Sequence, residues 1–278
     1  MHKKSALIFG LVVLLAVAGV VVFFGSKETR RQPHLKMDAY ASAQKGWQWL
    51  SHYQGKLLDP VVPFIMRSIN DRYCSSSLAG ESFWKKGWDE FKTDPYLRVF
   101  ERFFADPASY KISGTVLDVL GAPQRYPEYN IVLPEALYCD LHPVPSDFFQ
   151  KAFGNISHAS GYDLTHEFWS AALFKENGCV DGAHDVGAIL SGAAQRLIQE
   201  ENASSFDDLY AERAAFLMRY GFGDLVPAGW VETIIKNQDS SGGWGTPTFF
   251  GADSENPHTT ALAIWALTQY TGECPFSN

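Results

Sequence analysis

Two neighbouring stretches decide the fold of this chain: Lys236-Asn-Gln-Asp-Ser-Ser-Gly-Gly-Trp-Gly245 and Asn256-Pro-His-Thr-Thr-Ala-Leu-Ala-Ile-Trp-Ala-Leu267. Residues 227–238, which lead into the first stretch, carry charges on one side only, as an amphipathic surface helix does. The glycines around Trp244 predict a turn. The second stretch is apolar on every side, so a helix formed by it must be surrounded by other helices. Together they predict one helical hairpin within a ring of hairpins.

The rest of the chain repeats this contrast between one-sided and fully apolar helices. Residues 168–174, within the expected helix 163–175, are the second segment that is apolar on all faces, and no long alternation of apolar and polar residues indicates a strand. Residues 106–146 contain many prolines and receive no assignment. The sequence predicts an all-α protein, an α/α toroid-like ring of helical hairpins that is either complete or incomplete. The expected helices are 37–54, 60–70, 94–104, 146–153, 163–175, 183–201, 205–220, 227–238 and 257–270.

The N-terminus predicts a membrane anchor. Residues 6–25 form an uninterrupted apolar run without charge, flanked by lysines and arginines. At about 1.5 Å of rise per residue, such a run spans a bilayer core of roughly 30 Å. A cleaved signal peptide is the alternative, although the run is long for one and lacks a small-residue cleavage site. We expect an anchor in residues 1–25, a linker in residues 26–36 and one domain in residues 37–278.

Charge and cysteine spacing exclude two classes of function. The net charge is -8 and no basic stripe is present, so nucleic acid is not an expected partner. The four cysteines are widely spaced and form no Cys-x-x-Cys, which excludes the usual zinc-finger spacings. They can form two disulfides in an oxidising compartment or remain four buried thiols elsewhere. The lysines and arginines that flank residues 6–25 slightly favour the C-terminal side as cytoplasmic. A large domain after a very short N-terminal tail is nevertheless often translocated, so we expect the domain to lie outside the cytoplasm, in the periplasm or the extracellular space.

The hairpin stretch resembles a known repeat. The segment from Trp230 through Gln238 to Gly245 resembles the Gln-Trp repeat of terpenoid cyclases and related α/α toroids. The segment from Lys45 to Gln54 is similar to a decayed copy of that repeat. The acidic catalytic motif of the cyclases, Asp-x-Asp-Asp, is absent, and Asp207-Asp208 does not replace it. The resemblance therefore implies architecture alone.

A second resemblance covers roughly residues 150–270. The segment Gly161-Tyr-Asp-Leu-Thr-His166, the segment Gly221-Phe-Gly-Asp224 and the segment His258-Thr-Thr-Ala261 resemble matching segments of the secreted family typified by the human chromosome 16 open reading frame 89 protein. That family has no established activity to transfer. The resemblance implies a fold and an extracytoplasmic setting.

Two histidines are placed where chemistry is possible. Pro257 suits the first position of a helix with Asn256 as its N-cap, which places His258 in the first turn. Asp163 is the expected N-cap of the other apolar helix, which places His166 in the first turn there. Because the inner helices of a toroid all run the same way, both imidazoles should face one mouth. The positive end of a helix disfavours imidazolium, so both rings should be neutral.

A neutral imidazole can bind a metal or accept a proton. Two histidines with one carboxylate are a common catalytic metal set, although the sequence identifies no particular metal or cofactor. We take His166, His258, Asp163 and Glu255 as the candidate catalytic residues. Further carboxylates that could complete the site are Glu167, Asp224 and Asp253. The simpler alternative is that each histidine only hydrogen-bonds a loop carbonyl.

Three functions are compatible with this pattern. The first is a hydrolase or lyase that acts on a glycan or a peptide within a histidine-lined cavity. The second is a non-catalytic binding or scaffold domain. The third, favoured only by the apolar inner helices, is a lipid-binding toroid. The expected partners are the membrane, through residues 6–25, and a small-molecule, glycan or peptide ligand.

Overall fold

The computed structural model of the chain describes residues 33–54, 57, 60–75, 77–94, 97–106, 110–120, 128–144, 147–154, 156–179, 184–201, 205–245 and 256–276. Helices dominate these residues, and none of them forms a β-strand. The prediction of an all-α fold is therefore confirmed.

The helices follow one another with short connections. A first helix occupies residues 33–51. The later elements are α2 (Val61–Tyr73), α3 (Leu78–Phe91), the 3-10 helix η1 (Leu97–Phe104), α4 (Gly114–Leu120), α5 (Glu128–Tyr138), α6 (Phe148–Phe153), α7 (Gly161–Glu176), α8 (Val186–Glu201), α9 (Asp208–Arg219), the 3-10 helix η3 (Gly223–Leu225), α10 (Ala228–Lys236) and α11 (Pro257–Thr271).

Four elements were either not predicted or predicted as a different kind of helix. Helix α3 was not expected, because it buries few residues and so has little apolar periodicity. In η1, Leu97, Phe100 and Phe103 pack on the core at a spacing of three, which suits a 3-10 helix. Helices α4 and α5 lie in the unassigned region, where α5 contains Pro134 in its interior.

The first helix also corrects a predicted boundary. The chain is helical from residue 33 onward, so the end of the predicted linker 26–36 belongs to the domain. Pro33 was read as a linker residue, but proline is also favoured at the first position of a helix. Leu35 is buried against the core, which ties this first turn to the rest of the fold.

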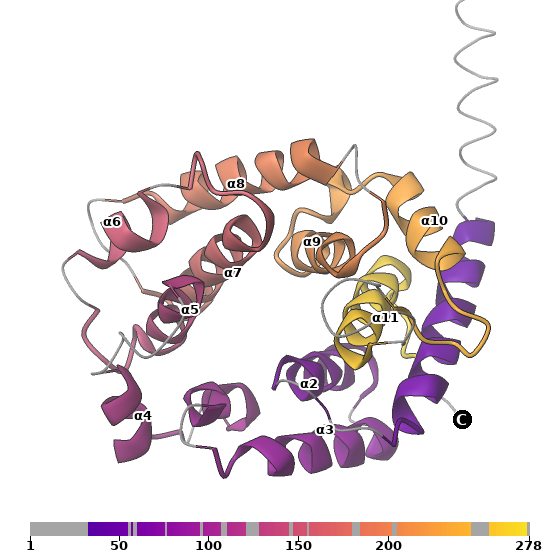
Figure 1. The fold of residues 1–278 in the computed structure, drawn as a ribbon, viewed down its shortest axis with the longest axis horizontal. Coiled ribbons are helices and arrows are strands. Elements are labelled where there is room, and N and C mark those ends of the chain that lie inside the picture. Colours follow the sequence, from indigo (N-terminus) through magenta and orange to yellow (C-terminus); the bar gives the residue numbers. More distant parts are fainter. Residues whose placement is uncertain are drawn as a thin grey trace, which may run out of the picture.

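The helices form an inner and an outer set (Figure 1). Helices α2, α5, α7, α9 and α11 lie inside, and the first helix, α3, α4, α6, α8 and α10 lie around them. Helix α11 is buried continuously from Thr259 to Thr268, whereas α10 buries only Trp230, Val231 and Ile234. This is the contrast that the all-apolar and one-sided patterns predicted.

The inner helices α7, α9 and α11 run in the same direction. At their starts, the Asp208 carboxylate of α9 accepts a hydrogen bond from the Tyr162 hydroxyl of α7 and contacts the His258 ring of α11, each at 3.0 Å. At their ends, Arg219 of α9 pairs with Glu176 of α7 at 2.8 Å. All three N-termini therefore open at one end of the molecule.

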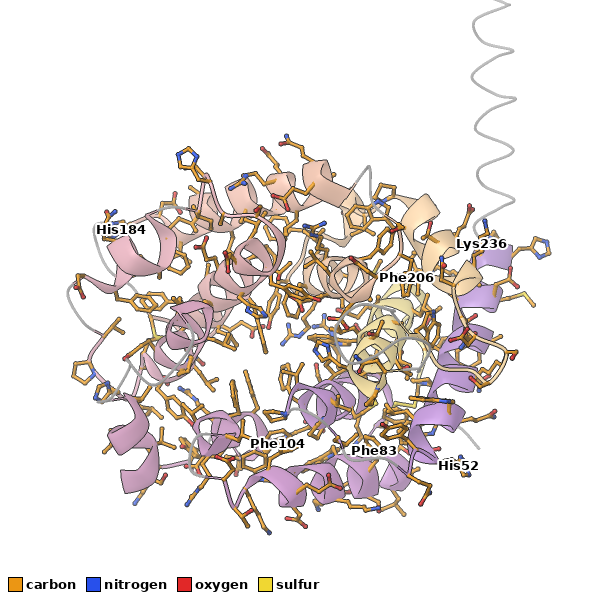
Figure 2. The ribbon with its side chains drawn as sticks, viewed as in Figure 1. His52, Phe83, Phe104, His184, Phe206 and Lys236 are labelled. Carbon is orange, nitrogen blue, oxygen red and sulfur yellow. A yellow bond between two sulfur atoms is a disulfide. The ribbon has the colours of Figure 1, made fainter. Side chains whose placement is uncertain are left out.

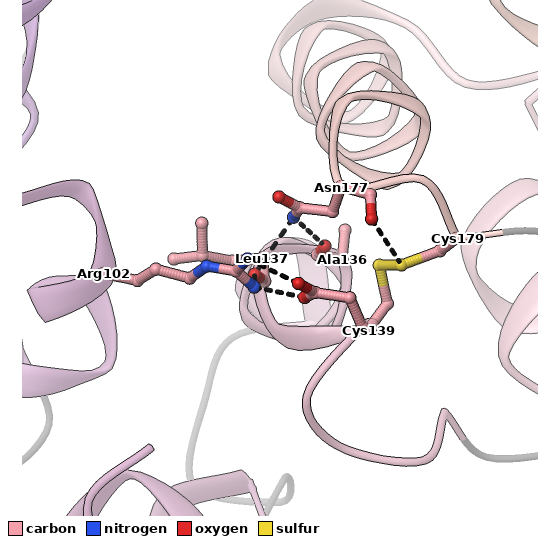
Figure 3. The surroundings of a disulfide bond; sticks show 7 residues. Arg102, Ala136, Leu137, Cys139, Asn177 and Cys179 are labelled. Carbon is pink, nitrogen blue, oxygen red and sulfur yellow. Dashed lines mark hydrogen bonds and ion pairs between the residues drawn. A yellow bond between two sulfur atoms is a disulfide. The ribbon is translucent and has the colours of Figure 1, made fainter. Parts of the chain in front are cut away.

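Both disulfides lie at the opposite end of these helices. Cys139 and Cys179 follow the ends of α5 and α7, and the Asn177 side chain beside them donates to the carbonyl of Ala136 at 3.0 Å (Figure 3). Cys74 and Cys274 join the residues that follow α2 and α11. The sequence left disulfides and free thiols open, and the structure pairs all four cysteines.

The Gln-Trp turn joins the last hairpin to the first helix. Trp244 is fully buried, and its indole nitrogen donates to the carbonyl of Ile234 at 2.7 Å. Its backbone nitrogen donates to the Thr260 hydroxyl at 2.9 Å, at the start of α11. The Gln238 amide donates to the carbonyl of Ser42 at 2.9 Å. Trp244 therefore holds the turn against both helices of the hairpin.

The predicted anchor, residues 6–25, falls outside the described part of the chain. Among the helices that are described, none combines the length and apolar character needed to cross a membrane.

Candidate functional site

His258 stands where its helix cap places it. The side chain of Asn256 accepts a hydrogen bond from the His258 backbone nitrogen at 2.8 Å, and Pro257 occupies the first position of α11. Asparagine at the N-cap followed by proline is a strong helix start, so the ring of His258 is fixed in the first turn, as predicted. Its side chain is 21% exposed.

Asp208 is the centre of the site. One oxygen, Oδ1, accepts a hydrogen bond from the Thr259 hydroxyl at 2.6 Å and lies 3.0 Å from Nδ1 of His258. The other, Oδ2, accepts from the Tyr162 hydroxyl at 3.0 Å. The preceding residue, Asp207, caps α9 by accepting from the Tyr210 backbone nitrogen. Because Asp207 caps the helix, the side chain of Asp208 can contact α7 and α11 instead.

These contacts keep Asp208 charged. Burial alone would raise the pKa of this carboxyl, but the charge on His258 and the hydrogen bonds from His258, Thr259 and Tyr162 outweigh burial and hold the pKa below its usual value. Because an ionised carboxylate only accepts, Nδ1 of His258 carries the shared hydrogen. When the charged ring releases its other proton, Nε2 bears the lone pair.

Glu212 lies one turn beyond Asp208 on α9 and is more deeply buried. Its side chain is 3% exposed, and its Oε1 has no hydrogen-bond partner among the described residues. Nε2 of His166 lies 3.8 Å from this oxygen, which is too long for a hydrogen bond. Burial raises the pKa of Glu212 to about 7, and the charge of Asp208 adds to the rise.

His166 is neutral at pH 7. Burial lowers the pKa of its ring to about 4, and the charge on His258 lowers it further. This agrees with the predicted neutrality, although desolvation rather than the helix terminus is the largest cause. The structure brings both imidazoles beside Glu212: His166 at 3.8 Å, and His258 with a ring nitrogen within 4.8 Å of a Glu212 oxygen.

Asp163 is not the N-cap of its helix. Helix α7 begins at Gly161 with Ser160 as its N-cap, so His166 lies in the second turn rather than the first. Serine and aspartate are both favoured N-caps, and the sequence alone offered two possible starts. Asp163 is exposed on the first turn, from where its charge raises the pKa of His166 slightly against the effect of burial.

The other proposed carboxylates are dispersed. Glu167 is half-buried beside His166, and burial raises its pKa to about 7. Asp224 is exposed in η3. Asp253 and Glu255 lie outside the described residues.

His184 lies away from these groups. It is exposed at the outer edge of the molecule, where its ring stacks on Phe149 at 4.6 Å (Figure 2). Asp185, its neighbour, accepts from the Ala188 backbone nitrogen at the start of α8. The pair has no part in the histidine cluster.

Asp208 and Glu212 were not among the site residues predicted from the sequence. A signal for them exists: they are four residues apart, and therefore on one face of α9, in a segment that is otherwise mostly apolar. Two acids facing the inside of a bundle need partners. Tyr162 and Thr259, which supply partners for Asp208, gave no comparable signal because hydroxyl residues are common at helix starts.

The cluster contains the groups that proton transfer or metal binding requires. One carboxylate is held ionised, one carboxylate is buried, and two imidazoles are in contact with them. The side chains of Asp208, His166 and His258 are 14–21% exposed, so the cluster is reached by solvent from one side.

Comparisons with protein-family models, with curated proteins and with solved structures gave no significant match to this chain. The functional argument therefore depends on the site itself.

Proposed function

We propose that this chain is a hydrolase or lyase that acts on a glycan or a peptide at the cluster of Asp208, Glu212, His166 and His258. One observation carries the proposal: the starts of three parallel helices bring two imidazoles and two carboxylates into contact with one another at a partly exposed position. Groups of this kind are costly to bury together and tend to gather at functional sites.

The Asp208–His258 contact supplies the reactive group. Through its contact with Nδ1, Asp208 fixes the orientation and tautomer of the His258 ring. The lone pair on Nε2 is then available to accept a proton or to bind a metal ion. Hydrolysis needs an activated water, and elimination needs a proton removed beside a polar bond, so the same cluster serves either reaction class.

The polar surroundings favour a glycan or a peptide over a lipid. The hydroxyls of Tyr162 and Thr259 lie within hydrogen-bond distance of Asp208, so the site is lined by polar groups. Between the inner helices, the rings of Phe103 and Trp169 stack with their centroids 5.7 Å apart. The ring centroids of Phe64 and Phe103 are 4.1 Å apart. Packed aromatic rings argue against a large apolar cavity of the kind that a lipid-binding toroid requires.

We also propose the setting and the architecture. The inner and outer sets of helices support an α/α toroid-like ring, and the two disulfides suit an oxidising compartment. Together with the apolar run in residues 6–25, they support a domain held outside the cytoplasm by a single anchor. The resemblance of residues 150–270 to the secreted family implies the same extracytoplasmic setting.

The test uses the full chain, purified in detergent or in lipid nanodiscs, against panels of polysaccharides and peptides. New reducing ends or amines report hydrolysis, and ultraviolet absorbance of unsaturated products reports elimination. We expect His258→Ala to lower turnover by roughly 10²- to 10⁴-fold, the usual contribution of a positioned acid or base. Turnover that survives this substitution would contradict the assignment of the site.

The control is His52→Ala. His52 is exposed at the end of the first helix, at the outer edge of the molecule (Figure 2), and contacts the carbonyl of Gln48. Its loss should leave turnover unchanged. Binding of a glycan or peptide without any turnover would favour the non-catalytic binding domain instead.

A further inference from the structure

We propose that Asp208, Glu212 and His258 bind one divalent transition-metal ion, and that His166, beside Glu212, joins them as a fourth donor by a movement of its side chain. The inference deepens the proposed function, and it rests on that function only in treating this cluster as the active site. It assigns the imidazoles one of the roles open to them, that of metal ligands.

The distances between the donor atoms suit one ion. One ligand atom from each of Asp208, Glu212 and His258 lies within 4.8 Å of the other two. Two ligands on opposite sides of an ion, each at about 2.0–2.2 Å, are about 4.2 Å apart. Shifts of a few tenths of an ångström in these side chains would therefore bring all three atoms into coordination.

Glu212 provides an independent observation. Its side chain is 3% exposed, and its Oε1 has no hydrogen-bond donor among the described residues. A buried carboxylate oxygen without a partner is unfavourable, so a cation is expected to compensate it. The adjacent Arg213 directs its guanidinium to Glu200, at 2.6 Å.

His166 faces the same oxygen at a distance that fits coordination. Its Nε2 lies 3.8 Å from Oε1 of Glu212. This exceeds the roughly 2.7–3.2 Å of a hydrogen bond. Neighbouring ligands of one ion with bonds of about 2.1 Å lie about 3–4 Å apart. An ion between the two groups would explain why they approach one another without bonding.

The donors select the class of metal. Two imidazoles and two carboxylates form a mixed nitrogen and oxygen set, which suits Zn²⁺, Mn²⁺ or Fe²⁺. Ca²⁺ and Mg²⁺ are less suited, because they prefer oxygen ligands alone. Hydrogen bonds from Tyr162 and Thr259 hold Asp208 in place, as partners of metal-binding carboxylates do.

A second group of potential ligands does not compete. Cys139, Asp140 and Cys179 also lie within 4.8 Å of one another. Cys139 and Cys179 are bonded to each other, so neither offers a thiolate.

The test measures metal binding directly. The full chain, stripped with a chelator, is dialysed against Zn²⁺ and its metal content is determined by mass spectrometry. Co²⁺ is then used as a visible-absorbing probe of the coordination sphere. We expect about one equivalent of metal per chain, and a loss of affinity of more than about 10-fold in Glu212→Gln and His258→Ala.

The matched controls are Glu135→Gln, which removes another buried carboxylate, and His52→Ala, which removes an exposed imidazole. Both should bind metal as the unchanged protein does. Circular dichroism confirms that each variant is folded. If Glu212→Gln does not fold, His166→Gln, at a more exposed position, replaces it as the ligand variant. Failure of the unchanged protein to bind either metal, or unchanged binding in the folded ligand variants, would overturn the site.

The metal and the activity are separable. A protein that binds Zn²⁺ at this cluster without turning over any substrate supports the metal site and contradicts the proposed function alone. A protein that turns over substrate but binds no metal at this cluster contradicts the metal site alone.

Discussion

The indole ring of Trp244 packs directly against the backbone of Gly46, which belongs to the first helix. A Cβ added at Gly46 would lie 2.5 Å from Cζ3 of Trp244 and 3.0 Å from a side-chain carbon of Ile264. Both neighbours are completely buried and have no room to move aside. This contact joins the first helix to the last hairpin (Figure 1).

Gly46→Ala should therefore destabilise the protein. Inserting a methyl group into a filled core typically costs about 1–3 kcal/mol, which exceeds the roughly 0.5–1 kcal/mol that alanine gains over glycine within a helix. Urea denaturation followed by circular dichroism measures the change. Gly192→Ala in α8 is the control, because a Cβ there meets nothing within 4 Å. It should leave stability equal or raise it, and an equal gain at Gly46 would refute the close contact.

Trp244→Ala should cost more, about 3–5 kcal/mol, because it removes a fully buried ring from the core. It also leaves the carbonyl of Ile234 without the donor that the indole nitrogen provides. The melting temperature reports the effect. Trp49→Ala, at a half-buried position in the first helix, should cost clearly less. Equal losses in the two variants would argue that the turn contributes nothing special.

The sequence was sufficient to predict the last hairpin and the position of His258. The fully apolar pattern of residues 257–270 specifies an enclosed helix, and Asn256-Pro257 specifies where it starts. Both signals are local. They depend on residues within one turn of each other, and the tertiary structure did not override them.

Asp208 and Glu212 were not predictable in the same way. An acid at the start of a helix is normally read as a cap or as a partner of the helix dipole, and Asp207 does act as the cap. What distinguishes Asp208 is contact with Tyr162 and Thr259, which are distant in the sequence. Such a site exists only once the starts of three helices are brought together. The local sequence pattern therefore predicts the helices that form the site but not which of their residues belong to it.

The two disulfides should contribute unequally to stability. Cys74 and Cys274 are 200 residues apart, whereas Cys139 and Cys179 are 40 residues apart. In the chain-entropy model, closing the longer loop stabilises the folded state by about 1 kcal/mol more. Paired Cys→Ser variants, compared by urea denaturation, test this. The order would be reversed if the contacts around Cys139, rather than loop closure, determined the contribution.

Glu135 should make the stability of the protein depend on pH. This residue lies inside α5 and is 7% exposed, and burial raises the pKa of its carboxyl to about 7. Between the unfolded pKa of about 4.5 and the folded value, the native state binds a proton that the unfolded chain has released. The contribution of this carboxyl to stability is therefore full below about pH 4.5 and is lost as the pH rises to about 7.

Glu135→Gln removes this titration while keeping the size of the side chain. Each pKa unit corresponds to about 1.4 kcal/mol, so a rise from 4.5 to about 7 predicts that the variant gains roughly 3.5 kcal/mol relative to the unchanged protein between pH 4.5 and pH 8. The free energy of unfolding, measured in urea across this range, gives the difference curve. Glu273→Gln, at an exposed position, provides the baseline. A flat difference curve for Glu135→Gln would mean that the carboxyl is ionised within the fold and has a partner that offsets its burial.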